Sequence, residues 1–285
     1  LGSFTSVNYI HISSKTFYIR NGYRRCKRMI IKVFPDEKIL AKNLALEILK
    51  ELKKKKRLVL GCPGGRSLKK TYYYLGILSH TLNISLNNLI IIMMDEYVKK
   101  KNSTFYLVDK NNHYSCVRFC NNVIKKLLNY KKSNSNSLKK ENIYFPTAEN
   151  PQNYDLLIKK LGGIDIFLLA SGSTDGHVAF NNADSKLNQK THITRLSIKT
   201  RSDNMKTFPN FNKISEVPKY GLTVGLHTIS SLSKKAILVM TGKEKEYAFK
   251  KLSFKKKFTT SWPSSIIYKC KKAKIYIDKE VSVNL

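Results

Sequence analysis

The chain has 285 residues and a mass of 32.8 kDa, and its 42% hydrophobic and 11% aromatic residues exclude an intrinsically disordered protein. Its 53 Lys and Arg against 19 Asp and Glu give a net charge of +34, which attracts phosphorylated metabolites and polyanions alike, but the clustered basic and aromatic pattern of a nucleic-acid module is missing. The five cysteines form no Cys-x-x-Cys pair, which argues against a disulfide framework and a zinc site, and no apolar run reaches the roughly 20 residues that cross a bilayer.

Residues 1–28 form a basic N-terminal extension that contains no acidic residue and ends in Arg24-Arg25-Cys26-Lys27-Arg28. This composition fits either a processed organellar leader or a plain extension, and one domain is predicted over residues 29–285. We expect a cytoplasmic protein, with an organelle as the alternative if the extension is a leader. Neither a membrane nor a specific nucleic acid is expected as a partner, and a homo-oligomer is left open.

The first half of the chain alternates predicted strands with predicted helices. The strands are residues 30–34, 57–61 and 89–94, and the helices run from residue 36 into the lysine cluster at 53–56, over 68–78 and over 113–130. The polar stretch 99–112 is expected to be a mobile loop, and the Ser, Asn and Lys rich stretch 131–141 a surface insertion.

The second half continues the alternation after a long apolar run that ends at Ala170. Further strands are predicted at residues 222–226, 236–240 and 273–277, a helix at 247–252, a turn at 262–265 and irregular structure over 183–218. Strands that alternate with helices over the whole length predict an α/β fold: a doubly wound, mostly parallel, Rossmann-like sheet with helices on both faces.

Polar side chains follow four of the predicted strands, at the sheet edge where ligands bind in such folds. Gly64-Gly65-Arg66-Ser67 lies between a strand and a helix, so its backbone N–H groups, Arg66 and Ser67 would cradle an anion, and Lys245 would add a second positive charge. Asp95 is a candidate proton-transfer base, and Asp175 and His177 form a candidate acid/base pair, although a capping aspartate and a packed histidine would give the same spacing. An anion cradle, a carboxylate and an Asp/His pair without a metal set suit proton transfer on a small phosphorylated carbonyl or sugar.

From Met29 to its C-terminus the chain resembles the glucosamine-6-phosphate deaminase (isomerase) family, which shares its fold with 6-phosphogluconolactonases. The matching segments are Met94-Asp95-Glu96-Tyr97-Val98, Asp175-Gly176-His177-Val178-Ala179-Phe180-Asn181, Val217-Pro218-Lys219-Tyr220-Gly221-Leu222-Thr223-Val224-Gly225 and Trp262-Pro263-Ser264-Ser265. Val178-Ala179-Phe180-Asn181 agrees with the deaminases, because the lactonases typically have Thr-Ala-Ser after Asp-Gly-His.

The resemblance implies conversion of glucosamine 6-phosphate to fructose 6-phosphate and ammonia without a cofactor. It implies that His177 assists ring opening, that Asp95 moves the proton between C2 and C1, and that Asp175 orients His177. The phosphate would be held by Gly64, Gly65, Arg66, Ser67 and Lys245, together with Lys206 at a position where deaminases usually have Arg.

The chain departs from the family pattern at several positions. Asn182, which cannot ionise, stands where deaminases usually have a Glu that works with the histidine, and Asp184 is a candidate substitute. The turn is altered to Ser171-Gly172-Ser173-Thr174, the phosphate loop looks more like that of the lactonases, and His192 and Thr194 replace basic residues that bind an allosteric sugar in bacterial members. Two alternatives therefore stay open: a lactonase-like hydrolase in which His177 activates water, and a weakened homologue that only binds sugar phosphate or another partner.

Overall fold

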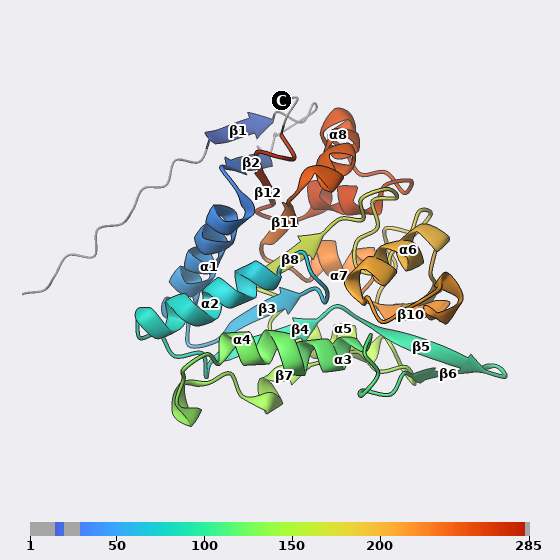
Figure 1. Ribbon diagram of the computed structural model, residues 1–285, viewed down its shortest axis with the longest axis horizontal. Helices are drawn as coiled ribbons and strands as arrows, with labels where there is room; N and C mark the ends of the chain where they lie inside the picture. The colour runs from blue at the N-terminus through green and yellow to red at the C-terminus, as the bar shows by residue number, and fades with distance from the viewer. Residues whose placement is uncertain (1–14, 20–28, 283–285) are drawn as a thin grey trace, which may run out of the picture.

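The structure is a computed structural model that describes residues 15–19 and 29–282. Its main sheet is mostly parallel: β1 is antiparallel to β2, and the other seven strands run parallel to one another (Figure 1). In spatial order the strands are β1 (Lys15–Ile19), β2 (Met29–Phe34), β12 (Lys274–Asp278), β11 (Ala236–Met240), β8 (Ile166–Ala170), β3 (Leu58–Cys62), β4 (Leu89–Met93) and β7 (Ile143–Tyr144). The predicted doubly wound α/β fold is confirmed.

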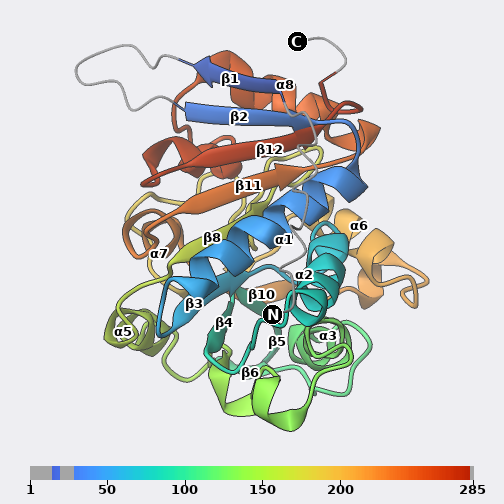
Figure 2. The ribbon, with the colours of Figure 1, turned by 90° about the vertical axis from the view of Figure 1, so that its left-hand side faces the viewer.

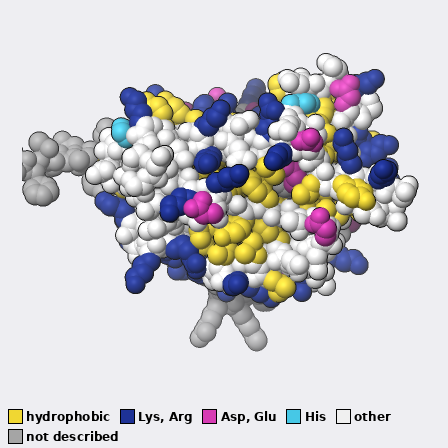
Figure 3. All heavy atoms as spheres, turned by 90° about the horizontal axis from the view of Figure 1, so that it is seen from below, with side chains coloured by type: hydrophobic (Ala, Val, Ile, Leu, Met, Phe, Trp, Pro, Cys, Tyr) yellow, Lys and Arg dark blue, Asp and Glu magenta, His cyan; other side chains and the backbone are white. Residues whose placement is uncertain are grey.

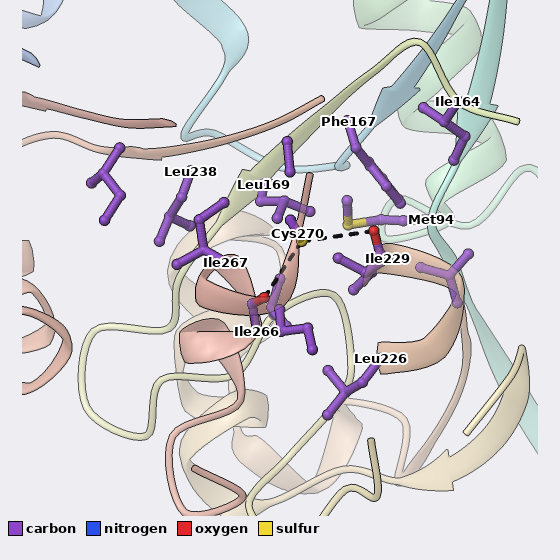
Figure 4. Close-up of a cluster of buried hydrophobic side chains, with 14 of the residues drawn as sticks. Met94, Ile164, Phe167, Leu169, Leu226, Ile229, Leu238, Ile266, Ile267 and Cys270 are labelled. Carbon is purple, nitrogen blue, oxygen red and sulfur yellow. Dashed lines mark hydrogen bonds between the residues drawn. The ribbon is translucent and has the colours of Figure 1, made fainter. Parts of the chain in front are cut away.

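Helices cover both faces of this sheet (Figures 1 and 2). One face packs against α1 (Glu37–Lys53), α2 (Lys69–Thr81) and a segment made of α3 (Cys116–Phe119), a π-helical turn (Cys120–Lys125) and α4 (Lys126–Leu128). The other face packs against α5 (Asn153–Lys160), α7 (Leu226–Ser231), α8 (Glu246–Lys255) and the 3₁₀ helix Pro263–Lys269. Figure 4 shows part of this second core, in which Phe167 and Leu238 of the sheet face Ile229 and Ile266 of the covering helices.

A second sheet was not predicted. It is antiparallel and four-stranded, with the order β6 (Thr104–Leu107), β5 (Asp95–Lys101), β10 (Tyr220–Thr223) and β9 (His192–Arg195). The expectation of a mobile loop at 99–112 is therefore wrong for the β5/β6 hairpin, and the irregular stretch 183–218 contains β9 and α6 (Ile198–Thr207). The part of β5 beyond Val98, with β6 and β9, escaped prediction because these segments are short and contain no buried residue, so they lack an apolar pattern.

An aromatic cluster holds this second sheet and α6 together. Its buried members include Tyr97, Tyr114, Phe180, Phe208 and Phe211. The rings of Tyr97 and Phe180 lie 5.0 Å apart, and those of Tyr114 and Phe211 lie 4.9 Å apart and stack. Such contacts contribute beyond their buried area, so this small unit has a core of its own.

Several element boundaries differ from the predicted ones. The predicted strand 222–226 is divided between β10 and the start of α7, the turn at 262–265 opens the 3₁₀ helix Pro263–Lys269, and the helix predicted over 113–130 begins only at Cys116 and is broken by the π-helical turn. Within residues 1–28 the structure describes only β1, so the leader prediction lies otherwise outside the described residues.

The surface is basic without a single concentrated patch on the face drawn in Figure 3, where Lys and Arg side chains are scattered around a central hydrophobic area. Within residues 15–19 and 29–282, none of the helices combines the length and the apolar composition that a membrane span requires.

Candidate active site

Loops at the carboxyl ends of four parallel strands meet at one cavity of about 100 Å³. They follow β3, β4, β8 and β11, the strands that form the middle of the main sheet. The predicted site residues that line the cavity are Gly64, Gly65, Arg66, Ser67, Asp95, His177 and Lys245. Four further polar residues of the lining were not singled out as site residues from the sequence: Cys116, Asp203, Asn204 and Thr207.

Asp95 is the first residue of β5 and is separated from the end of β4 only by Met94, so it lies where the main sheet passes into the antiparallel sheet. Its carboxyl is buried, and burial raises its pKa to about 7. The Cys116 thiol, 3.5 Å from Oδ1, lowers this pKa, the charge of Glu96 raises it and His177 lowers it. A carboxyl with such a pKa can both accept and return a proton near neutral pH.

The adjacent carboxylate, that of Glu96, has a structural role. It accepts hydrogen bonds from the backbone N–H groups of Tyr97, Cys116 and Val117 at 2.7 to 2.9 Å and from the Ser115 hydroxyl at 2.8 Å. These donors include the first N–H groups of α3, so Glu96 completes the cap of that helix. Of the two neighbouring carboxylates, only Asp95 lines the cavity.

Asp175 and His177 form the predicted pair. Asp175 Oδ1 lies 2.7 Å from Nδ1 of His177 and accepts the backbone N–H of His177 at 3.1 Å. Burial alone would raise the pKa of Asp175, but the hydrogen bonds from His177 and Thr200 hold it below its ordinary value. The pair needs a glycine at position 172, because a Cβ atom there would lie 2.3 Å from His177 Nδ1 and 2.4 Å from Asp175 Oδ1.

Asn182 is connected to Asp175 through the hydroxyl group of Thr200. The Thr200 hydroxyl lies 3.0 Å from Oδ2 of Asp175 and 3.1 Å from Oδ1 of Asn182, whose amide nitrogen donates to the Arg195 carbonyl at 2.7 Å. The candidate substitute Asp184 is exposed and does not line the cavity of His177; it lines a separate one of about 630 Å³, together with Asn182. Asp184 is therefore not placed to act on the imidazole.

The anion end of the site is built from two loops. Arg66 and Ser67 precede α2, and Lys245 ends the 3₁₀ turn Lys243–Lys245 after β11. Lys245 is only 8% exposed; its Nζ donates to the Ser171 carbonyl at 2.7 Å, and burial lowers its pKa. The same three side chains line an adjoining cavity of about 440 Å³, so they lie at the junction of two hollows.

Two predicted site residues do not line the cavity: Asp175, which lies behind His177, and Lys206, which has no contact with the site. Lys206 is exposed on α6, whereas Asp203, Asn204 and Thr207 of the same helix line the cavity. The reason is helical geometry, since positions 203, 204 and 207 share a face that position 206 does not.

The donor set gives little support for a bound metal. In the described part of the chain, the one grouping of three metal-binding side chains is Asp175, His177 and Asp203, whose nearest donor atoms lie within 4.8 Å of one another. Since Asp175 occupies Nδ1 of the imidazole, we assign this grouping no metal.

Comparison with known proteins places this geometry in a family. Residues 35–277 match the model described as glucosamine-6-phosphate isomerases/6-phosphogluconolactonase. The chain is 34% identical over 260 residues to a glucosamine-6-phosphate deaminase of Mycoplasma mycoides subsp. mycoides, an alignment that covers 90% of this chain and 98% of the relative. It is 30% identical over 258 residues to glucosamine-6-phosphate deaminase 1 of Bacillus subtilis, with the same two coverages.

Solved structures give the same result. A monomeric glucosamine-6-phosphate deaminase superposes with a TM-score of 0.75 at 26% identity, covering 89% of this chain and 98% of the other. A 6-phosphogluconolactonase of Thermotoga maritima superposes with a TM-score of 0.60 at 17% identity, over 87% and 98%, and shares the fold. The chain therefore belongs to the glucosamine-6-phosphate isomerase/6-phosphogluconolactonase family.

Proposed function

We propose that the protein is a glucosamine-6-phosphate deaminase, which converts glucosamine 6-phosphate to fructose 6-phosphate and ammonia. The observation that carries the proposal is that Asp95, with a pKa of about 7, and His177, backed by Asp175, line one cavity whose far end holds Arg66 and Lys245. The names of the relatives at 30 to 34% identity support it.

The phosphate is bound at the junction of the two cavities. Arg66 and Lys245 supply positive charge there, and Ser67 and the backbone of the glycine loop supply neutral donors. The inner cavity of about 100 Å³ then encloses the sugar carbons rather than the whole substrate. In this proposal the reacting end of the sugar lies between Asp95 and His177.

His177 opens the sugar ring. The C1–O5 bond breaks, the O1 hydroxyl gives its proton to the imidazole, and the imidazole gives a proton to O5, so the proton count balances. Asp175 accepts a hydrogen bond from Nδ1 and thereby leaves Nε2 as the nitrogen that meets the sugar.

Asp95 then moves a proton between the two carbons. Its carboxylate takes the proton from C2 while the aldehyde oxygen O1 gains a proton, which gives an enolamine, and it then returns the proton to C1 while the nitrogen gives up one proton, so the product is a 2-imino compound and the proton count balances. Water adds to C2 and ammonia leaves, which gives the ketose. Each step needs only acid/base chemistry, so the proposal requires no cofactor and no nucleic-acid or membrane partner.

The test is ammonia release from glucosamine 6-phosphate by the purified protein, measured in a coupled assay, with glucosamine as the unphosphorylated control. We expect release from the phosphorylated sugar, and strong loss of it in His177→Gln. A wild-type protein that binds glucosamine 6-phosphate and yet releases no ammonia would contradict the proposal.

Two alternative functions have distinct outcomes in the same experiment. A lactonase-like enzyme, favoured by the sequence of the Gly64 to Ser67 loop, would hydrolyse 6-phosphogluconolactone and would not need Asp95. A weakened homologue would bind the sugar phosphate but turn over slowly, and Asn182→Glu would then raise the rate about ten-fold or more. No change in Asn182→Glu would favour a protein that has kept binding alone.

A further inference from the structure

Asp203 lines the cavity but has no role in the reaction steps proposed above. It comes from α6, and a carboxylate oxygen lies within 4.8 Å of a ring nitrogen of His177 and of a carboxylate oxygen of Asp175. Among the described residues, no cation lies within 4.0 Å of this carboxylate and no hydrogen bond to it is formed. It is partly exposed and faces the cavity.

The two carboxylates near His177 differ in their surroundings. Asp175 forms hydrogen bonds with His177, Ser197 and Thr200 and is not part of the cavity lining. Asp203 lies in the lining itself, where no described group donates a hydrogen bond to its carboxylate and where its charge opposes the lowering of the Lys245 pKa by burial. The imidazole is therefore flanked by one saturated carboxylate and one open carboxylate.

We propose that Asp203 is a positioning residue for His177: a second carboxylate that holds the proton on the imidazole while the sugar ring opens. The proposal rests on the proposed deaminase function. Its chemical basis is that His177 becomes an imidazolium between taking the O1 proton and protonating O5, and a nearby negative charge stabilises that cation. The two groups lie within 4.8 Å but form no direct hydrogen bond, so the interaction is through charge or through a bridging water or sugar hydroxyl.

The other groups around His177 explain why such a carboxylate is needed. Lys245 and Arg66 line the same cavity and disfavour a protonated imidazole. Asp95 offsets them only in part, because its pKa of about 7 leaves it partly neutral. Asn182 carries no charge, and Asp95 and Asp203 are the described carboxylates that line the cavity. Asp203 is thus the remaining carboxylate on the cavity side of the imidazole.

The experiment follows the ring protons of His177 by NMR through a pH titration, with His177→Gln to identify the resonances. In Asp203→Asn we expect the midpoint of the His177 titration to move to lower pH by about half a unit or more. Asp203→Glu, which keeps the charge, should retain the wild-type midpoint. Asp184→Asn removes an exposed carboxylate that lines a different cavity and is the matched control.

Activity gives a second readout. In Asp203→Asn we expect kcat to fall about ten-fold while KM changes less than about three-fold, because the residue acts through His177 and not on the phosphate. Adding Asn182→Glu to Asp203→Asn should recover part of kcat, since it supplies a carboxylate from the other side of Thr200. A residue that only supports α6 would show no such recovery.

The outcomes separate this inference from the deaminase proposal. An unmoved His177 titration in Asp203→Asn overturns the role of Asp203, even in a fully active enzyme. A moved titration in a protein that releases no ammonia supports the second carboxylate and overturns the deaminase function instead.

Discussion

Two regions build the active site in different ways. The floor of the cavity is the carboxyl edge of the main sheet, where β3, β4 and β11 are buried along their whole length. The cap is the antiparallel sheet with α6, whose strands β6 and β9 have no fully buried residue. The floor is held by strand neighbours on both sides, and the cap by its aromatic cluster.

The floor supplies most of the reacting groups, and the cap mainly encloses the cavity. The floor loops deliver His177 and the cation Lys245, while α6 of the cap contributes Asp203, Asn204 and Thr207 to the lining. Asp95 lies at the joint between the two regions. Variants of the floor should therefore change kcat or phosphate binding strongly, and variants of the cap should have smaller effects.

The strongest test of this division is Asp95→Asn. We expect kcat to fall about 10²–10⁴-fold, the usual contribution of a positioned acid/base group, with KM within about three-fold of wild type. Steady-state kinetics with glucosamine 6-phosphate measures both. Equal losses in Asp95→Asn and in a cap variant would contradict the separation of roles.

The same variant should be more stable than the wild type at high pH. Asp95 has a folded-state pKa of about 7 against an ordinary 3.8, so the folded protein keeps a proton that the unfolded chain has released. Stability is thus lost as the pH rises from 3.8 to about 7, and Asp95→Asn removes that loss, a gain of about 2–4 kcal/mol at pH 8. Urea unfolding at pH 4 and pH 8 measures it, and an equal gain at both values would refute the cause.

Lys245→Gln and Lys206→Gln compare one cation of the floor with one of the cap. Lys245 is buried at the cavity junction, and Lys206 is exposed on the outer side of α6. We expect KM to rise about 10- to 100-fold in Lys245→Gln, from loss of a charged contact to phosphate, and to change less than about two-fold in Lys206→Gln. The reverse order would place the phosphate on the cap.

The pH dependence of kcat should follow the ionisation of Asp95, the residue that lies between the floor and the cap. Asp95 accepts the C2 proton only when ionised, so kcat should rise with pH through about 7, the pKa to which burial raises it. One pH unit below that value kcat should be about ten-fold lower than on the plateau. A rate profile from pH 5 to 9 measures the limb, and a profile flat down to pH 5 would exclude Asp95 as the base.

The smallest effect is expected for Phe208→Leu, a variant of the cap. Phe208 belongs to the aromatic cluster and also lines the cavity. We expect about 1 kcal/mol less stability, a KM raised about three-fold and an unchanged kcat. Thermal unfolding and kinetics measure these quantities, and a kcat that fell with KM unchanged would show that the aromatic cluster, and not only Asp203 of the cap, acts on the chemical step.

The floor could be predicted from sequence because its strands are continuous apolar runs that end in small or polar residues. That pattern places Asp95, His177 and Lys245 at one edge without any knowledge of packing. The resemblance to the deaminases then gives each residue its role, which spacing alone does not provide.

The cap could not be predicted, because its stability lies in contacts between distant residues. Tyr97, Phe180 and Phe208 meet in space but follow no local period. Without α6 in view, Lys206 looks like a phosphate ligand and Asp203 has no role, although the turn of the helix decides which of them faces the cavity.

Gly172 also restricts which residues this position of the sequence can accept. A side chain of any size at this position would push apart the carboxylate of Asp175 and the ring of His177. Position 172 is therefore closed to any residue that carries a Cβ atom. It can serve as a marker in genome surveys, where a copy with another residue at this place has given up the Asp175/His177 hydrogen bond.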